Sequence, residues 1–330
     1  LTDVEIKNNE INWEIINNKN NINMKKVYET NESRQESMVI KKNISRKINS
    51  REIGPHLHIN NFLKRKEILP SINWKSSFDG GVAGGVGNQN ISSKIDYGLN
   101  NNSILSFIFS ESDDPLYNKI NGQKVPNDWH NFAIQFKRNI FETKNKKDNL
   151  DIVMSLEYWK IGSGSETSKS IFNQTDNING KQRFDKYIGS LSFPYTKKLN
   201  KRITIAFAPG LSLLPEKLGL KSSDNNFYGN NYFLSSGLIY EFHENFSLNG
   251  SYTFLFGPGT NSFNNNLDFS NTNIYSYGIG WDMSPSIGLE AKITNAYGST
   301  PATSLLTIPS ADKPLYSFDI KYKPFVNEQK

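Results

Sequence analysis

From Ile72 onward, large apolar side chains alternate with small or polar ones in one stretch of the chain after another. The clearest stretch is 245–257. One set of its alternate positions holds aromatic and apolar residues: Phe246, Leu248, Tyr252, Phe254 and Phe256. The other set holds small polar residues: Asn249, Ser251 and Thr253. Because successive side chains of a β-strand point to opposite faces, this period predicts a strand with one apolar and one polar face.

Twelve stretches with this alternation follow one another along the chain. They lie near residues 72–86, 91–99, 103–110, 129–140, 149–161, 184–195, 201–212, 230–242, 245–257, 272–282, 285–296 and 314–325. The connections after the second, fourth, sixth, eighth and tenth stretches are short. Those after the third, fifth, seventh, ninth and eleventh are long and rich in Gly, Asn, Ser, Asp and Pro. Only the first hairpin departs from this order, because its link is short.

Regular alternation of short turns with long loops is typical of a membrane barrel. One rim of such a barrel has tight turns and the other has long loops. The strands are long enough, since about 9 to 11 tilted residues cross the hydrocarbon. We therefore predict an all-β fold, a closed antiparallel up-and-down transmembrane β-barrel of about 12 strands in residues 71–330.

Aromatic residues are expected at both rims, where rings with a polar tip favour the lipid headgroups. Near the rim with short turns these are Tyr240, Phe242, Phe246, Trp281 and Tyr322. Near the other rim they are Tyr158, Phe254, Phe256 and Tyr316. The alternative is a soluble β-sandwich, in which the same rings would form a core. The polar faces carry Ser, Gly, Ala, Thr and Asn with sparse charge, which favours a lumen over an open surface.

Residues 1–70 differ from the rest of the chain. They hold 13 basic and 9 acidic residues and show no sustained period of apolar positions. Dense mixed charge with few apolar residues predicts a polar, largely unstructured extension. An even number of strands brings both chain ends to the rim with short turns, so we expect the N-terminal segment and the C-terminus in the periplasm. The sequence begins without a signal peptide, and we expect any such peptide to lie outside it.

The last stretch, YSFDIKYKPF at 316–325, resembles the C-terminal assembly signal of bacterial outer-membrane β-barrel proteins. Its alternating aromatic and apolar positions match that signal: Tyr316, Phe318, Ile320 and Tyr322. Pro324 before Phe325, and the tail VNEQK after it, depart from the pattern. The resemblance implies a Gram-negative outer membrane, with outer-membrane lipid and the barrel assembly machinery as partners. It names no subfamily.

Composition excludes several kinds of chemistry. The chain has no Cys, which excludes disulfides, thiolate metal sites and a Cys nucleophile. No run of about 18 apolar residues is present, so a transmembrane helix is excluded. The net charge is only +6, and we predict no nucleic-acid partner. The four His residues are too few and too scattered for a metal or heme site: His56, His58, His130 and His243. We therefore predict no metal and no cofactor.

Barrels of this size also include outer-membrane enzymes. A lipid hydrolase needs a Ser activated by a His, and the predicted barrel offers only His130 and His243. Neither lies in a sequence like that of the outer-membrane phospholipases, so we predict that the protein is not an enzyme. The Gly-rich run at 80–87 lacks the Lys and Ser/Thr of a phosphate loop and fits a curved strand better. The acids at 113–114 lack the ligand spacing of a calcium loop.

Charged residues on the polar faces are the candidates for the lumen lining. They are Lys94, Lys137, Glu157, Arg202, Glu241, Glu290, Lys292, Asp319 and Lys321. Because acids and bases are mixed, these residues fit either ion pairs across the wall or a permeation pathway. We predict a channel or export/uptake protein for a small polar solute or a glycan. The alternative is a surface interaction or polysaccharide assembly protein with a plugged barrel, and a filled lumen favours this alternative.

Overall fold

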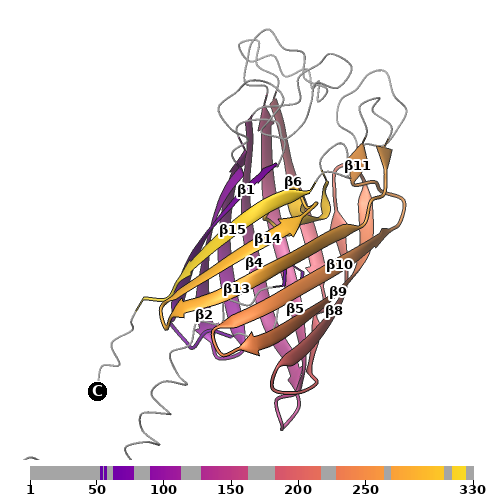
Figure 1. Cartoon of the computed structure of the whole chain (residues 1–330). Helices are drawn as coiled ribbons and strands as arrows, with labels where there is room; N and C mark the ends of the chain where they lie inside the picture. Colours follow the sequence, from indigo (N-terminus) through magenta and orange to yellow (C-terminus); the bar gives the residue numbers. More distant parts are fainter. Residues whose placement is uncertain are drawn as a thin grey trace, which may run out of the picture. The chain divides into compact units, whose positions relative to one another are not determined.

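The structure is a computed structural model that describes residues 53–54, 56–57, 62–77, 90–112, 128–162, 183–216, 228–263, 269–307 and 314–324. Its main element is one antiparallel sheet. The first and last strands of this sheet pair with each other, so the sheet closes into a barrel (Figure 1). Within the described ranges, no helix has the length and apolar character needed to span a membrane.

The barrel sheet contains 13 strand segments. They are β1 (Ile68–Ser77), β2 (Asn90–Asn100), β3 (Ser103–Ser112), β4 (Asp128–Glu142), β5 (Asp148–Gly162), β6 (Arg183–Ser192), β7 (Tyr195–Lys198), β8 (Ile203–Leu213), β9 (Asn230–His243), β10 (Phe246–Phe256), β13 (Ile274–Ser284), β14 (Ile287–Thr294) and β15 (Leu315–Tyr322). A separate small sheet pairs β11 (Ser262–Phe263) with β12 (Phe269–Ser270).

The segments β6 and β7 are two halves of one wall strand. Both pair with β5 on one side and with β8 on the other. The break falls at Pro194, which has no N–H to donate to the sheet. The Pro194 carbonyl still accepts a hydrogen bond from the Asp151 N–H at 2.9 Å. The wall is therefore a closed antiparallel barrel of 12 strands, and the predicted fold is confirmed.

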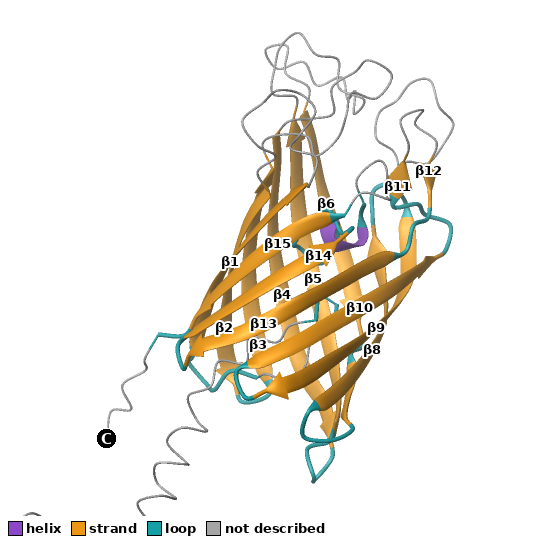
Figure 2. Cartoon of the chain, viewed as in Figure 1, coloured by secondary structure: helices purple, strands orange, loops and turns teal. Residues whose placement is uncertain are grey.

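The turns β2–β3, β4–β5, β7–β8, β9–β10 and β13–β14 are short and lie at one end of the barrel, which we call the short-turn rim (Figure 2). Most strand ends agree with the sequence patterns. The exception is β1, which begins at Ile68, inside the segment expected to precede the barrel. The Gly-rich run at 80–87 and the acids at 113–114 lie outside the described residues.

The two faces of the wall differ in exposure as the alternation predicts. On β10, the exposed fractions of Leu248 and Phe254 are 47% and 49%, whereas Ser247 and Asn249 are buried. The predicted facing of this strand is therefore confirmed. Other strands carry exposed apolar residues on the same outer face, among them Ile72, Ile95, Phe107, Ile134, Leu156, Phe207, Leu234, Ile279 and Phe318. An apolar exterior around a polar interior is typical of a barrel whose wall is surrounded by lipid.

Aromatic residues lie on the outer face near both ends of the strands. Close to the short-turn rim, the rings of Phe246 and Trp281 stack with their centroids 5.8 Å apart. Toward the other end, the Tyr232 and Phe256 rings stack at 6.3 Å. These positions agree with two aromatic girdles.

Closure of the sheet makes a prediction about the protein in detergent. Every wall strand pairs on both sides, so no strand edge is open. We expect an unboiled sample to migrate differently from a boiled sample on a detergent gel, because the folded barrel stays compact until heat unfolds it. Identical mobilities, together with solubility in the absence of detergent, would instead favour the β-sandwich.

Two segments of the chain lie inside the barrel. We call residues 53–57, of which 53–54 and 56–57 are described, the lumen arm, and residues 295–307 the inward loop. The loop includes the short 3-10 helix η2 (Thr303–Leu305). Side chains of the arm and wall form one apolar cluster: Ile53, Leu57, Ala206, Ala208 and Ile239. Side chains of the loop and wall form another: Phe233, Leu255, Ile274, Ala296 and Leu305. The arm thus departs from the unstructured extension expected for residues 1–70.

Candidate functional site

The lumen arm packs against the inner face of β8 and β9. Ile53 and Leu57 are only 1% and 2% exposed. A Cβ at Gly237 on β9 would lie 2.8 Å from both the Ile53 Cγ2 and the Leu57 Cδ1 atoms. Glycine at this position therefore allows the arm to approach the wall closely.

His56 joins the lumen arm to the inward loop. Its Nε2 atom lies 2.7 Å from the Pro301 carbonyl oxygen, and its ring centroid lies 4.4 Å from that of Phe233. Burial lowers the pKa of the His56 imidazole from 6.5 to about 4, and the hydrogen bond to Pro301 opposes this shift. The imidazole is therefore neutral at neutral pH and donates its Nε2–H to the carbonyl.

The inward loop is bonded to its surroundings by side chains that donate to its main-chain carbonyls. The donors are Lys75, Asn90 and Asn261. The loop also turns back on itself at Gly298, where a Cβ would lie 1.9 Å from the Thr303 Oγ1 atom. Only glycine fits there, so the fold of the loop depends on this position.

Glu157 on β5 binds the inward loop from deep inside the wall. Its carboxyl group is fully buried and accepts three hydrogen bonds. Thr300 Oγ1 donates at 2.6 Å, the Ala302 N–H at 2.5 Å and Trp159 Nε1 at 3.1 Å. Glu157 was predicted to face the lumen, and the structure places it there with both carboxyl oxygens engaged by these donors.

Buried aromatic rings fill the lumen beside Glu157. The Trp129 ring lies 5.4 Å from Trp159 and 4.8 Å from Tyr297, and Tyr228 lies 6.5 Å from Trp159. Neither tryptophan was predicted to face the lumen, because large rings were expected on the lipid face. Trp159 is two residues from Glu157 and therefore lies on the same face of β5. This spacing is the signal that could have placed Trp159 in the lumen.

Three rows of lumen-facing residues run across β14, β15, β1 and β2 at matching register. The first row, toward the short-turn rim, is Gly288, Lys321, Ser71 and Lys94. The middle row is Glu290, Asp319, Asn73 and Ser92. The third row, toward the inward loop, is Lys292, Ser317, Lys75 and Asn90. We call these rows the charged wall. Its two carboxyl groups lie between two rows that each carry two lysines.

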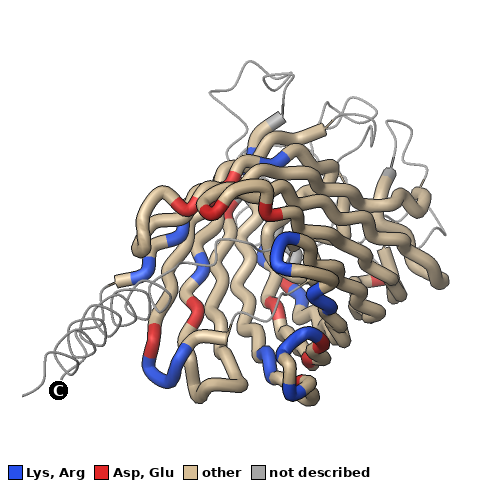
Figure 3. Tube along the Cα trace, turned by 60° about the horizontal axis from the view of Figure 1, so that its bottom comes forward, with Lys and Arg blue, Asp and Glu red and all other residues tan. Residues whose placement is uncertain are grey.

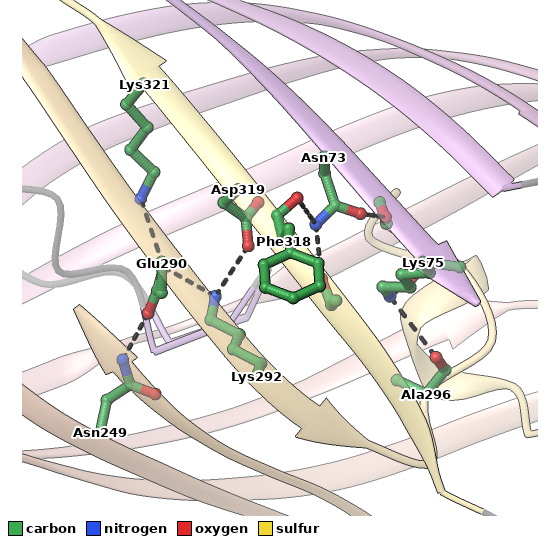
Figure 4. Close-up of polar contacts among 12 residues, drawn as sticks. Asn73, Lys75, Asn249, Glu290, Lys292, Ala296, Phe318, Asp319 and Lys321 are labelled. Carbon is green, nitrogen blue, oxygen red and sulfur yellow. Dashed lines mark hydrogen bonds and ion pairs between the residues drawn. The ribbon is translucent and has the colours of Figure 1, made fainter. Parts of the chain in front are cut away.

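Ion pairs connect the rows of the charged wall (Figure 4). Lys292 Nζ lies 3.0 Å from Glu290 Oε2 and 3.6 Å from Asp319 Oδ2. Lys321 Nζ lies 3.7 Å from Glu290 Oε2, and Asn249 on β10 donates to the Glu290 carboxyl group. Ion pairs across the wall, one of the two roles expected for the charged lumen residues, are thus present here. Each acid is paired with lysine on a neighbouring row.

A cavity of about 130 Å³ lies between the lumen arm and the charged wall. Its charged lining residues are Lys75, Lys94, Lys292, Asp319 and Lys321. Most other lining residues of the wall carry a hydroxyl or an amide, among them Ser71, Asn73, Ser92, Ser251, Ser276 and Ser317. The cavity therefore has polar walls on the side away from the arm.

The remaining residues that were predicted to line the lumen lie outside the charged wall. Lys137 on β4 is buried, and its Nζ atom lies 3.2 Å from Asp151 Oδ2. Arg202 was expected in a strand, but β8 begins at Ile203, and Arg202 is exposed in the preceding turn. The Arg202 carbonyl accepts a hydrogen bond from the Glu241 N–H at 2.8 Å, so both residues belong to the short-turn rim. Figure 3 shows Lys and Arg on several turns of this rim.

Two cavity-lining residues of the charged wall, Asn73 and Lys75, and one contact, from Asn249 to Glu290, were missing from the sequence-based predictions. Asn73 and Lys75 alternate with Trp74, whose ring is on the outer face beside Phe318. Their alternation with Trp74 was thus enough to indicate that both residues face the lumen. Asn249 was assigned to the lumen face, but its role as a donor to Glu290 depends on a contact between β10 and β14 that no local pattern reveals.

No protein-family model and no curated protein matches this chain. Solved structures resemble its fold. The NanC porin is 8% identical with a TM-score of 0.48, over 77% of this chain and 100% of that chain. An outer-membrane channel from Pseudomonas putida F1 is 10% identical with a TM-score of 0.48, over 79% and 96%. The translocator domain of the autotransporter NalP from Neisseria meningitidis is 10% identical with a TM-score of 0.45, over 80% and 89%.

At these identities the resemblance concerns the fold alone. The decisive observations are the closed wall of 12 strands and its apolar outer face. The chain forms a β-barrel of the transmembrane type.

Proposed function

We propose that this barrel is a non-enzymatic outer-membrane channel for a small polar solute, and that the lumen arm closes it in this structure. The observation that carries the proposal is the small size of the inner-wall side chains, among them Ser92, Ser106, Ser190, Ser235 and Ser247. A barrel of about eight strands is filled by its own side chains. Here the wider lumen holds the arm, the inward loop and a remaining cavity.

Of the two segments inside the barrel, the lumen arm is the one that can leave the lumen. Its described contacts with the wall are the apolar packing of Ile53 and Leu57, and His56 bonds to the inward loop. No wall strand has to separate from its neighbours for these contacts to break. The inward loop, in contrast, is bonded to the wall through Glu157 and Lys75.

The proposal includes an orientation and partners. An even number of wall strands brings the start of β1 and the end of β15 to the short-turn rim, and we propose that this rim faces the periplasm. The resemblance of residues 316–325 to an assembly signal supports insertion by the barrel assembly machinery. Outer-membrane lipid would then surround the apolar face of the wall.

We expect Gly237→Leu to open the channel in the full-length chain. The new side chain would take the space of the Ile53 and Leu57 methyl groups and expel the arm. Single-channel recording in planar lipid bilayers should show a higher conductance for this variant than for the parent. The matched control is Gly189→Ala, because a Cβ there would meet only Leu213 Cδ1, at 3.9 Å.

A change on the arm itself checks the same result. Leu57→Asp would bury an unpaired carboxylate beside Ala206 and Ala208, so the arm should leave the wall. If both variants keep a heat-modifiable barrel and conduct no better than the parent, the channel proposal is wrong.

The second candidate is an interaction or polysaccharide assembly barrel with a permanently plugged lumen. The observation that favours it is the strength of the inward loop's attachment. Glu157 and the buried Trp129 and Trp159 rings would keep the loop in the lumen after the arm had left. A barrel that stays closed in both variants above would support this candidate.

A further inference from the structure

The cavity beside the lumen arm has an excess of positive charge among the described residues. Four lysines and one acid, Asp319, line it. Glu290 and Asp96 pair with these lysines at 3.0–3.7 Å but lie outside the lining. Lys75 donates to the Ala296 and Gly298 carbonyls, so the excess lies in the lining itself, where Asp319 is the one acid among the described residues. A solute in the cavity therefore meets a surface that favours anions.

Hydroxyl and amide groups lie between the lysines of the charged wall. Ser71 separates Lys321 from Lys94, and the middle row offers Asn73 and Ser92. The first and third rows are four residues apart along each strand, or about 13 Å at 3.3 Å per residue. The ammonium groups of Lys292 and Lys321 are closer together than the rows, because they lie 3.0 Å and 3.7 Å from the same Glu290 Oε2 atom. A solute moving along the wall from the short-turn rim thus meets Lys94, then the Lys321 and Lys292 pair, then Lys75.

We infer that the charged wall is a binding strip for small hydroxycarboxylates and gives the channel a preference for anions. The ammonium groups would bind the carboxylate, and the serine and asparagine side chains would bond the hydroxyls. Because Lys292 and Lys321 already share Glu290, a solute competes with an internal acid and binds weakly. Weak binding at successive sites is what conduction requires. The inference rests on the proposed channel function and names its solute class.

The test uses the full-length parent and its Gly237→Leu variant in planar bilayers under a potassium chloride gradient. We expect reversal potentials that report a preference for chloride. Gluconate, a six-carbon hydroxycarboxylate, should reduce the chloride current in a saturable manner. Sorbitol, its uncharged counterpart of similar size, should not.

Charge-removing variants locate the effect. Lys292→Gln combined with Lys321→Gln should move the reversal potential toward zero and abolish the block by gluconate. The matched control is Lys323→Gln. Lys323 lies 3.3 Å from Glu67 and does not line the cavity, so this variant should keep both properties.

The outcomes separate the strip from the channel. Conduction without anion preference, or a lysine variant that still prefers anions, overturns the strip and leaves the channel proposal intact. If no variant conducts, the channel proposal fails, and calorimetric titration of gluconate into the detergent-solubilised parent decides the strip. If gluconate binds the parent and the double variant Lys292→Gln with Lys321→Gln does not bind it, the strip is supported. If gluconate does not bind the parent, the strip is overturned.

Discussion

Replacing Glu157 by leucine should lower the free energy of unfolding of the barrel by roughly 3 kcal/mol, since each of three buried donors left unpaired costs about 1 kcal/mol or more. The donors are the Thr300 hydroxyl, the Ala302 N–H and the Trp159 indole N–H. Leucine is similar in size to glutamate, so the loss reports hydrogen bonds rather than a cavity. Urea unfolding of the barrel in lipid vesicles, followed by tryptophan fluorescence, measures this difference.

The same substitution should loosen the inward loop, because Glu157 accepts hydrogen bonds from Thr300 and Ala302 of the loop. Proteolysis of folded barrels should then cut within 295–307 in the variant and spare the parent. The matched control is Ser155→Ala on the same face of β5. Ser155 is buried, and its Oγ atom has no hydrogen-bond partner within the described part of the chain. A leucine variant as stable and as protease-resistant as the parent would show that Glu157 does not hold the loop.

The facing of the wall residues was predictable because alternate residues of a strand point to opposite faces. Once Phe318 and Ile320 were assigned to lipid, Asp319 and Lys321 had to face the lumen, and both line or border the cavity in the structure. Their grouping with Lys75 and Asn73 was beyond local reasoning. It depends on the register between β1 and β15, which exists only when the barrel closes.

The contents of the lumen were not predictable from periodicity. Ile53 and Leu57 stand in a polar segment without any repeat, and they become buried only by meeting Ala206 and Ala208, far along the chain. The wall strands that contact the arm nevertheless carried a signal in their sequence. Ala206, Ala208 and Gly237 put small side chains or none at lumen positions of two neighbouring strands, which leaves space for a segment from elsewhere.

Arginine at Tyr252 should lower the stability of the barrel by roughly 2–4 kcal/mol, the cost of a guanidinium near the middle of the lipid face. Tyr252 shares the outer face of β10 with Phe254, and their ring centroids lie 4.8 Å apart. Arginine at the adjacent Ser251 should cost far less, because Ser251 lines the polar cavity of the lumen and does not face lipid. Folding of both variants into lipid vesicles, measured as free energies of unfolding, gives the comparison.

The pair of variants is its own control, since the same side chain is placed one residue apart on one strand. A shift of register by one residue would exchange the two faces and reverse the order of the costs. Equal costs would mean that neither face of β10 contacts hydrocarbon, as expected for a sandwich in water. The difference between the two free energies therefore tests the facing of the strand and the transmembrane position of the wall together, independently of any conductance.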